Sequence, residues 1–157
     1  MKTPKPISRN FDKVALKAKL LMLEHDLIDQ NEARFKDFTR AAKLDFSAVR
    51  DDQDGSQARQ NSVLAAGIER QIHEHTHHKE QLASISFDSK SRVEGGAIVS
   101  LNGRHFVVAV PTPVFEFEGV EMMGISVNAP LAQGMIGLSA GDEFTLGNLT
   151  HSVDQVW

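Results

Sequence analysis

The sequence predicts an α+β protein, in which an N-terminal antiparallel helical hairpin of coiled-coil type precedes a small antiparallel β domain with one short helix. Residues 10–50 contain neither proline nor glycine and space their apolar residues as a helix does. Turn-forming residues gather near residue 53, and from residue 94 short β-branched runs alternate with glycine turns. We therefore expect a hairpin over residues 1–84, a linker over 85–92 and a β domain over 93–157.

The first predicted helix runs from about residue 10 to residue 50. Its Leu16, Leu20, Leu23 and Leu27 follow steps of four, three and four, which is the spacing of a coiled-coil seam. A helix of about 40 residues is about 60 Å long at 1.5 Å per residue, too long for a small globule to cover. It therefore needs a partner helix of similar length.

That partner is expected directly after a turn. The run Asp51-Asp52-Gln53-Asp54-Gly55-Ser56 interrupts the helical pattern, and its Asp54 or Ser56 is suited to cap a second helix. The side chains expected on the inner face of the second helix are Ala65, Ile68, Ile72, His75, Leu82 and Ile85. Two long helices joined by a short loop pack antiparallel.

The β domain is predicted from its turns. Two apolar runs, 97–101 and 104–110, flank Asn102-Gly103, the strongest short signal for a hairpin. A further strand is expected at 122–127. Asn128 is then expected to cap a short helix that Pro130 opens and Gly137 closes. A last hairpin is expected to turn at Gly147-Asn148, between strands at 144–146 and 152–156.

Composition restricts the class of protein. The 157 residues include no cysteine, which excludes disulfides and thiolate zinc sites and suits a reducing cytoplasm. We find no stretch of ~18 apolar residues that would span a membrane, and no apolar signal segment follows Met1. The net charge of −4 is uneven, since residues 96–157 hold one basic residue, Arg104, against six acids. That third is therefore poorly suited to bind phosphates.

The basic residues gather at the N-terminus instead. They are Lys2, Lys5, Arg9, Lys13, Lys17 and Lys19. Such a basic helix could contact nascent RNA or DNA, but a solvated helix face is the more common reason for this pattern.

The C-terminal region resembles the Gre-factor (GreA/GreB) family of bacterial transcript-cleavage factors. The matching motif is Ile125-Ser126-Val127-Asn128-Ala129-Pro130-Leu131-Ala132-Gln133-Gly134-Met135-Ile136-Gly137, followed by Gly141-Asp142-Glu143-Phe144. The stretch Gly95-Gly96-Ala97-Ile98-Val99-Ser100-Leu101 is similar to the family's first strand. Ala129 stands where the family usually has serine. The hairpin matches the family in architecture only.

The resemblance implies a mechanism. In the Gre factors an FKBP-like β domain docks at the rim of the secondary channel of RNA polymerase, and the hairpin reaches the catalytic centre. Acidic residues at its tip there help to hold a Mg²⁺ ion shared with the polymerase, which cleaves its own backtracked RNA during transcription elongation. The resemblance thus implies an accessory factor with no enzymatic activity or cofactor of its own. The docking residues it implies here are Asn128, Pro130, Leu131, Gln133 and Met135, with Met122 or Met123 contributing.

The family tip carries an Asp followed three residues later by a Glu. The corresponding pair here is Asp51 and Asp54, with Asp52 in reserve. Residues three apart share a face of a helical turn, and Mg²⁺ prefers one or two carboxylates together with water and phosphate oxygens. Aspartate is one methylene shorter than glutamate, so a relative that occupies the channel without cleaving RNA is the alternative.

Two other functions are suggested by single motifs. His73-Glu74-His75-Thr76-His77 satisfies the HExxH pattern of zinc proteases, but a catalytic zinc needs a third ligand. Adventitious metal binding by His73, His75, His77 and His78 is the simpler expectation. With the hairpin turning near residue 53, His75 is expected opposite Asn31 and Glu32 in a polar layer, and the other histidines are expected to be exposed.

The second is peptidyl-prolyl isomerisation, as an FKBP-like fold suggests. The aromatic residues of such pockets typically include tyrosine and tryptophan. This chain has no tyrosine and a single tryptophan, Trp157.

Overall fold

The computed structural model describes residues 9–48 and 52–157, without the side chains of residues 42, 44–48, 52–55 and 58. The chain divides into two compact units. One, the hairpin unit, is Leu20–Glu80. The other, the sheet unit, contains residues up to Lys19 and Gln81–Trp157. The segment 85–92, expected as a linker, lies in the sheet unit, where the Phe87 side chain is buried.

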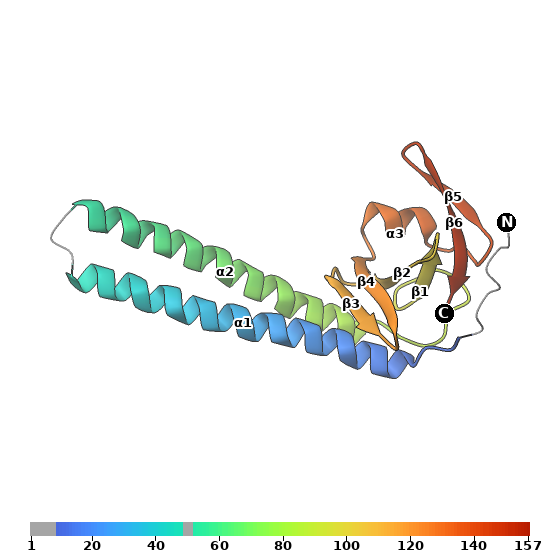
Figure 1. Cartoon of the computed structure of the whole chain (residues 1–157), viewed down its shortest axis with the longest axis horizontal. Coiled ribbons are helices and arrows are strands. Elements are labelled where there is room, and N and C mark those ends of the chain that lie inside the picture. Colours follow the sequence, from blue (N-terminus) through green and yellow to red (C-terminus); the bar gives the residue numbers. More distant parts are fainter. Residues whose placement is uncertain (1–8, 49–51) are drawn as a thin grey trace. The chain divides into compact units, whose positions relative to one another are not determined.

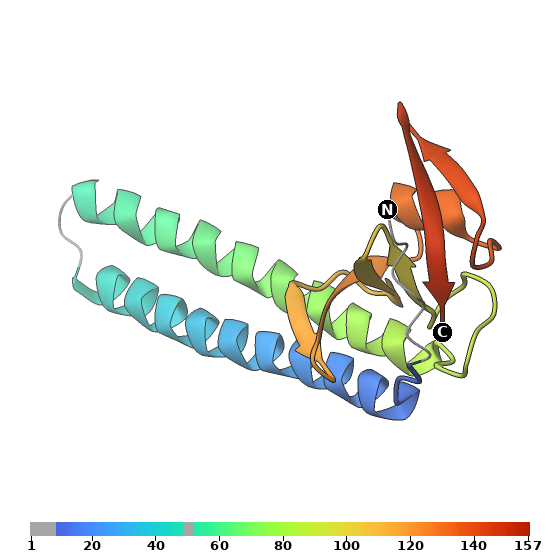
Figure 2. The ribbon, with the colours of Figure 1, turned by 45° about the vertical axis from the view of Figure 1, so that its right-hand side comes forward.

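The predicted antiparallel helical hairpin is confirmed. Helix α1 spans Lys13–Ala48 and helix α2 spans Asp52–Ser84, and the two run side by side in opposite directions (Figures 1 and 2). The predicted turn was placed too late, because residues 52–56 already belong to α2. The expected caps at Asp54 and Ser56 are therefore wrong, and Asp51 lies outside the described residues.

The seam of the hairpin differs in part from the predicted one. Leu20 is fully buried as expected, but Leu23 and Leu27 are only half-buried, and Glu24 and Ile28 take the inner positions. Among the described side chains of α2 in this unit, Ala65, Ile68 and His78 are buried. From Leu20 to Ile28 the buried positions on α1 follow steps of four, and this places the Glu24 carboxylate inside the seam.

In the described part of the chain the sheet has six strands, in the order β3-β4-β2-β1-β6-β5. Their bounds are β1 Ile98–Leu101, β2 Arg104–Ala109, β3 Val114–Phe117, β4 Val120–Ser126, β5 Glu143–Leu146 and β6 Leu149–Val156. The Asn-Gly hairpin is confirmed, since β1 and β2 pair antiparallel around Asn102 and Gly103, whose φ values are 49° and 79°. The hairpin at Gly147-Asn148 is confirmed as the pair β5–β6.

The sheet is mostly rather than wholly antiparallel. Strands β2 and β4 pair in parallel, with the strand β3 placed at the edge beyond β4. The connection after β2 passes close to Gly124, whose N–H donates to Thr112 Oγ1 at 2.8 Å. A Cβ at position 124 would lie 2.3 Å from the Val110 carbonyl oxygen, so the approach requires glycine.

The core of the sheet unit is apolar and closed. One cluster of its buried residues consists of Val93, Ala97, Val99, Leu101, Val108, Ile125, Ala132, Met135 and Val153. Helix α3, Pro130–Met135, lies beside the sheet (Figure 1) and contributes Ala132 and Met135 to this core. It packs against β5, where Gly134 lies against the Phe144 ring. The predicted helix is thus confirmed, with Pro130 in its first turn.

The predicted cap of α3 is wrong. The N-cap residue is Ala129, and no side chain accepts a hydrogen bond from this end of the helix. Gln133 instead binds the chain before the helix, since its Nε2 donates to the Val127 carbonyl oxygen at 2.8 Å. Gly137 follows the last turn with a φ of 85°, as predicted for the residue that ends the helix.

None of the helices within residues 9–48 and 52–157 is both long and apolar enough to cross a membrane.

Candidate functional site

The acidic end of the hairpin is formed where α1 ends and α2 begins. Asp52 and Asp54 lie in the first turn of α2, where the backbone N–H groups carry partial positive charge and favour carboxylates. Their side chains, and the whole of Asp51, lie outside the described residues. Within the hairpin unit α1 runs from Leu20 to Ala48, about 45 Å at 1.5 Å per residue. Asp52 and Asp54 therefore lie at the far end of the hairpin from residues 20 and 80.

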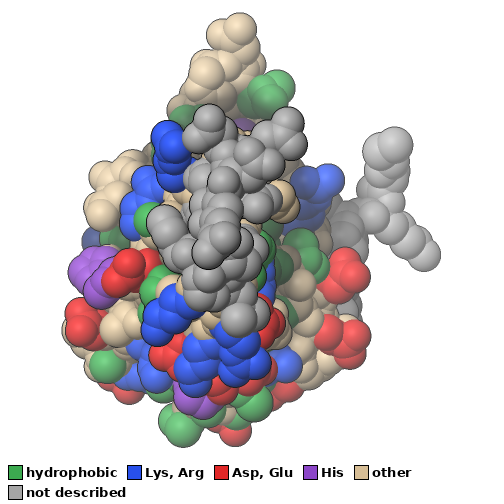
Figure 3. All heavy atoms as spheres, turned by 90° about the vertical axis from the view of Figure 1, so that its left-hand side faces the viewer, with side chains coloured by type: hydrophobic (Ala, Val, Ile, Leu, Met, Phe, Trp, Pro, Cys, Tyr) green, Lys and Arg blue, Asp and Glu red, His purple; other side chains and the backbone are tan. Residues whose placement is uncertain are grey.

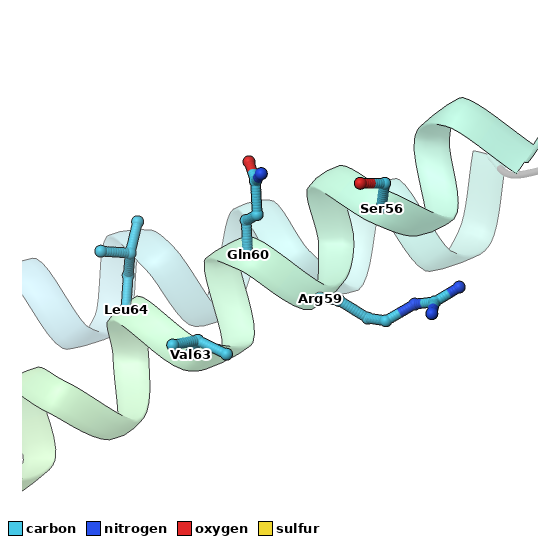
Figure 4. A pocket seen from close by; sticks show the side chains of 5 residues that line it. All are labelled: Ser56, Arg59, Gln60, Val63 and Leu64. Carbon is cyan, nitrogen blue, oxygen red and sulfur yellow. The ribbon is translucent and has the colours of Figure 1, made fainter.

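An open groove lies on α2 close to this end. It is lined by Ser56, Arg59, Gln60, Val63 and Leu64 (Figure 4). Val63 is 71% exposed and Leu64 is 52% exposed, although both are apolar. Figure 4 shows the Gln60 and Leu64 side chains pointing in the same direction from the helix. On the face shown in Figure 3, basic and acidic side chains are interspersed.

A second group of polar side chains lies inside the seam of the hairpin. Glu24 of α1 is fully buried and faces two histidines of α2. The His75 Nδ1 lies 2.7 Å from Glu24 Oε2, and the His78 Nδ1 lies 3.4 Å from the same oxygen. Two predictions are thereby corrected. His75 faces Glu24, about two helical turns along α1 from Asn31, and His78 is buried rather than exposed.

The shift of register has a simple cause. The inter-helix connection comes earlier in the chain than residue 53, so every position of α2 pairs with an earlier position of α1. Asn31 is buried as expected, but it accepts a hydrogen bond from Arg34 of its own helix at 3.5 Å.

The HExxH residues point away from this group. His73, Glu74 and His77 are exposed, and His77 Nδ1 lies 3.7 Å from Glu80 on the same helix. Within the described part of the chain, Glu24, His75 and His78 form the one group of three or more side chains placed to share a metal ion. No third ligand meets His73 and His77 there, so the geometry gives no support to a zinc protease.

Some of the residues expected to contact a partner are exposed, and others are buried in the core. Asn128, Pro130 and Gln133 are exposed and Leu131 is half-buried. Met135 is fully buried in the core of the sheet unit, so it cannot be a surface contact. Met122 is buried as well and Met123 is exposed, because neighbouring residues of a strand face opposite sides of the sheet.

Three of the N-terminal cations bind main-chain oxygens of their own unit. The Arg9 guanidinium donates to the Glu118 carbonyl oxygen, and Lys13 Nζ donates to the Trp157 oxygen at 2.8 Å. Lys17 Nζ donates to the Ala83 and Ile85 carbonyl oxygens and so caps the end of α2. Burial, followed by the charge of Lys90, lowers the pKa of Lys13 to about 8. These three residues are structural, and Lys2 and Lys5 lie outside the described residues.

An aromatic cluster holds the start of α1 against the sheet. Trp157 packs against Phe11 and His105, with ring centroids 5.1 and 5.8 Å away, and its Nε1 donates to the Arg9 carbonyl oxygen at 2.6 Å. Burial, and then the charge of Arg9, lowers the pKa of His105, against a smaller opposite effect of Asp154. The single tryptophan therefore packs on the N-terminal segment, and the isomerase function gains no support from it.

Sequence reasoning missed Glu24 and His78 as a pair. The signal was present, because Leu16, Leu20, Glu24 and Ile28 form an unbroken series in steps of four. Leu23 and Leu27 instead favoured the series 16, 20, 23 and 27 as the buried face of the helix. A charged residue on an otherwise apolar helix stripe is the observation that would have identified the site.

The fold and the hairpin end together define a class of protein, a two-helix hairpin with an acidic end joined to a small sheet unit. No protein-family model and no curated protein matches the chain. Solved structures similar to it include the following three. The transcription factor Gfh1 is 19% identical with a TM-score of 0.35, covering 87% of this chain and 92% of that one. GreA factor homolog 1 of Thermus thermophilus is 20% identical with a TM-score of 0.33, covering 87% and 94%.

The third structure, Gfh1 of Thermus aquaticus, is 20% identical with a TM-score of 0.33 and covers 85% of this chain and 90% of that one. At these sequence identities and TM-scores, the similarity assigns no activity to this chain.

Proposed function

We propose that this protein is an accessory factor of bacterial RNA polymerase, which enters the secondary channel with its hairpin and stimulates the polymerase to cleave backtracked RNA. The observation that carries the proposal is the two-helix hairpin with carboxylates at its far end. An antiparallel pair of helices about 45 Å long is narrow enough to enter a channel that excludes a globular domain. The protein is then not an enzyme, and the hydrolysis belongs to the polymerase.

For stimulated RNA cleavage, the end of the hairpin needs to supply only carboxylates. Asp51 and Asp54, with Asp52 beside them, would supply carboxylate oxygens to a Mg²⁺ ion that the polymerase also holds. A second metal ion in a two-metal site activates the attacking water and stabilises the leaving oxygen. Residues with carboxylates and no other reactive group therefore suffice, provided that the polymerase supplies the remaining ligands.

The sheet unit would dock the hairpin at the channel entrance. Exposed Asn128, Pro130 and Gln133, with half-buried Leu131, form one surface around the start of α3. Met123 is exposed on the neighbouring strand β4. A mixed surface of this kind, with apolar groups among hydrogen-bonding ones, is typical of protein interfaces.

A non-cleaving regulator is the second candidate, and one observation favours it. The tip pair is Asp51 with Asp54 rather than an aspartate with a glutamate, so one carboxylate reaches a methylene less far. Mg²⁺ needs its ligands near 2.1 Å, and a ligand held too far away does not help to bind it. Such a hairpin would occupy the channel and slow RNA synthesis without shortening the transcript.

Stalled, backtracked elongation complexes separate the two candidates. The cleavage model expects the protein to shorten the RNA from its 3′ end, and expects Asp51→Asn or Asp54→Asn to slow this on the order of 100-fold. Glu69→Gln, a change of an exposed acid further along α2, is the matched control and should leave the rate unchanged. Suppressed synthesis with RNA of unchanged length would establish the regulator instead. Failure to bind the polymerase at all would exclude both.

A further inference from the structure

The polar group inside the hairpin seam has features that a helix interface alone does not explain. Glu24 has no solvent exposure, and the side chains of His75 and His78 are 20% and 11% exposed. All three belong to the hairpin unit, Glu24 on α1 and the two histidines one helical turn apart on α2. They face one another from two helices, and both histidines direct Nδ1 to the same carboxylate.

Hydrogen bonding within the group is incomplete. His75 Nδ1 lies at hydrogen-bond distance from Glu24 Oε2. Within the described part of the chain, however, neither Glu24 Oε1 nor His78 Nδ1 has a hydrogen-bond partner, and both atoms are buried. A buried polar atom without a partner costs about 1–3 kcal/mol, and more when the group is charged. A cation bound by the carboxylate and the two imidazoles would give His78 Nδ1 a partner, and a water bound to that cation could donate a hydrogen bond to Glu24 Oε1.

The positions of the donor atoms suit a tetrahedral metal ion. One nitrogen from each histidine and one carboxylate oxygen all lie within 4.8 Å of one another. Ligands at 2.0–2.1 Å from a tetrahedral ion are about 3.3 Å apart. The distance of 3.4 Å from His78 Nδ1 to Glu24 Oε2 already has this value, and the 2.7 Å from His75 Nδ1 needs to widen by about half an ångström.

We propose that Glu24, His75 and His78 bind a single Zn²⁺ ion, with water as the fourth ligand, and that this ion ties α1 to α2 within the hairpin. Two imidazoles and one carboxylate form a ligand set that zinc adopts in proteins. The partly exposed His75 gives the ion and its water a route from solvent. The site differs from the HExxH motif, because it combines His75 with His78 and does not use His73 or His77.

A buried ion pair without metal is the competing explanation. It accounts for the contact of Glu24 with His75 and for a fixed register between the helices. It does not account for His78, whose Nδ1 approaches the same carboxylate without a hydrogen bond to it. A metal ion explains why three donors converge where a pair would need only two.

The test uses the full chain, stripped of metal with a chelator and then titrated with Zn²⁺ against a chromophoric competitor. We expect one ion per chain and a thermal unfolding midpoint that rises with Zn²⁺. His78→Gln and Glu24→Gln should each weaken binding roughly tenfold or more, since even outer partners of metal sites contribute that much. The double variant His73→Ala/His77→Ala is the control, because both side chains are exposed on the same helix, and it should bind normally.

A spectroscopic measurement covers the case in which a variant fails to fold. Co²⁺ bound to the unaltered chain should give the intense visible absorption of a four-coordinate ion, and Zn²⁺ should displace it. Binding that persists in His78→Gln and Glu24→Gln, or that disappears in the His73/His77 variant, would overturn the site. Absence of stoichiometric Zn²⁺ binding by the unaltered chain would do the same. None of these measurements involves RNA polymerase, so their outcome is independent of the proposed function.

Discussion

The two units of this protein are stabilised in opposite ways. The sheet unit has a core of aliphatic side chains and a methionine, closed by α3. The hairpin unit has one seam, in which apolar Leu20, Ile28 and Ile68 share the buried positions with charged and polar groups such as Glu24 and His78. The difference indicates that the sheet unit is a stable anchor, whereas the order of the hairpin depends on how its polar groups are satisfied.

The largest expected effect comes from removing the buried charge partner. In metal-free protein, Glu24→Ala leaves the histidines without their carboxylate and should destabilise the hairpin by about 3–5 kcal/mol. Helical circular dichroism should report this loss. Trp157 fluorescence, which reports on the sheet unit, should stay unchanged. Replacing Glu24, His75 and His78 together by leucine should restore the hairpin, and persistent loss of helix in that triple variant would contradict the explanation.

A substitution in the core of the sheet unit should destabilise that unit slightly less, and Trp157 fluorescence should report the loss. Met135→Ala opens a cavity in a closed core and should cost about 2–5 kcal/mol in denaturant unfolding followed by Trp157 fluorescence. Met123→Ala, at an exposed position of β4, is the matched control and should cost less than about 1 kcal/mol. Equal costs for the two methionines would show that the unit is not anchored by this core.

The side-chain cap at the start of α1 is expected to contribute about 1 kcal/mol to the stability of the sheet unit. Asp12 caps the helix, since its Oδ1 accepts a hydrogen bond from the Ala15 N–H at 3.0 Å. Asp12→Ala should therefore destabilise the sheet unit by about 0.5–2 kcal/mol, whereas Asp26→Ala, at an exposed position inside the helix, should not. Equal effects of the two substitutions on the unfolding midpoint would contradict the capping role of Asp12.

The smallest expected effect depends on pH. Burial and Arg9 lower the pKa of His105 in the folded state. The unfolded chain therefore takes up a proton first as pH falls below the ordinary histidine value of about 6.5, and folding stability decreases on the acid side. His105→Gln should remove this part of the pH dependence of sheet-unit unfolding. A wild-type stability that rises as pH falls from 7 to 5, relative to the variant, would contradict the assignment.

Local rules predicted most of the fold. The absence of proline and glycine predicted the hairpin helices, and the Asn-Gly and Gly-Asn turns predicted the β1–β2 and β5–β6 hairpins. The strand β3 was missed, because it is only four residues long and follows two prolines, Pro111 and Pro113. The parallel pairing of β2 with β4 was missed as well, since strand order depends on contacts between distant residues.

The candidate sites were less predictable, for a related reason. The run from Asp52 to Ser56 was expected in a turn but begins α2, because aspartate and serine favour both turns and the first turn of a helix, and the role of its acids stays a prediction. The group of Glu24, His75 and His78 depends on the register between two helices. An error of a few residues in the turn moves every inter-helix contact, so its members were found only in the structure.

The central claim is that the acidic end of the hairpin reaches the catalytic centre of RNA polymerase. The chain has no cysteine, so Gln53→Cys provides a unique attachment point for an iron chelate that generates hydroxyl radicals. We expect this probe to cut the polymerase chain around its catalytic Mg²⁺, and expect the same probe at Leu149→Cys, on exposed β6, to cut only elsewhere. Cuts at the same sites from both probes, or none near the catalytic Mg²⁺ from residue 53 in a complex that forms, would contradict the claim.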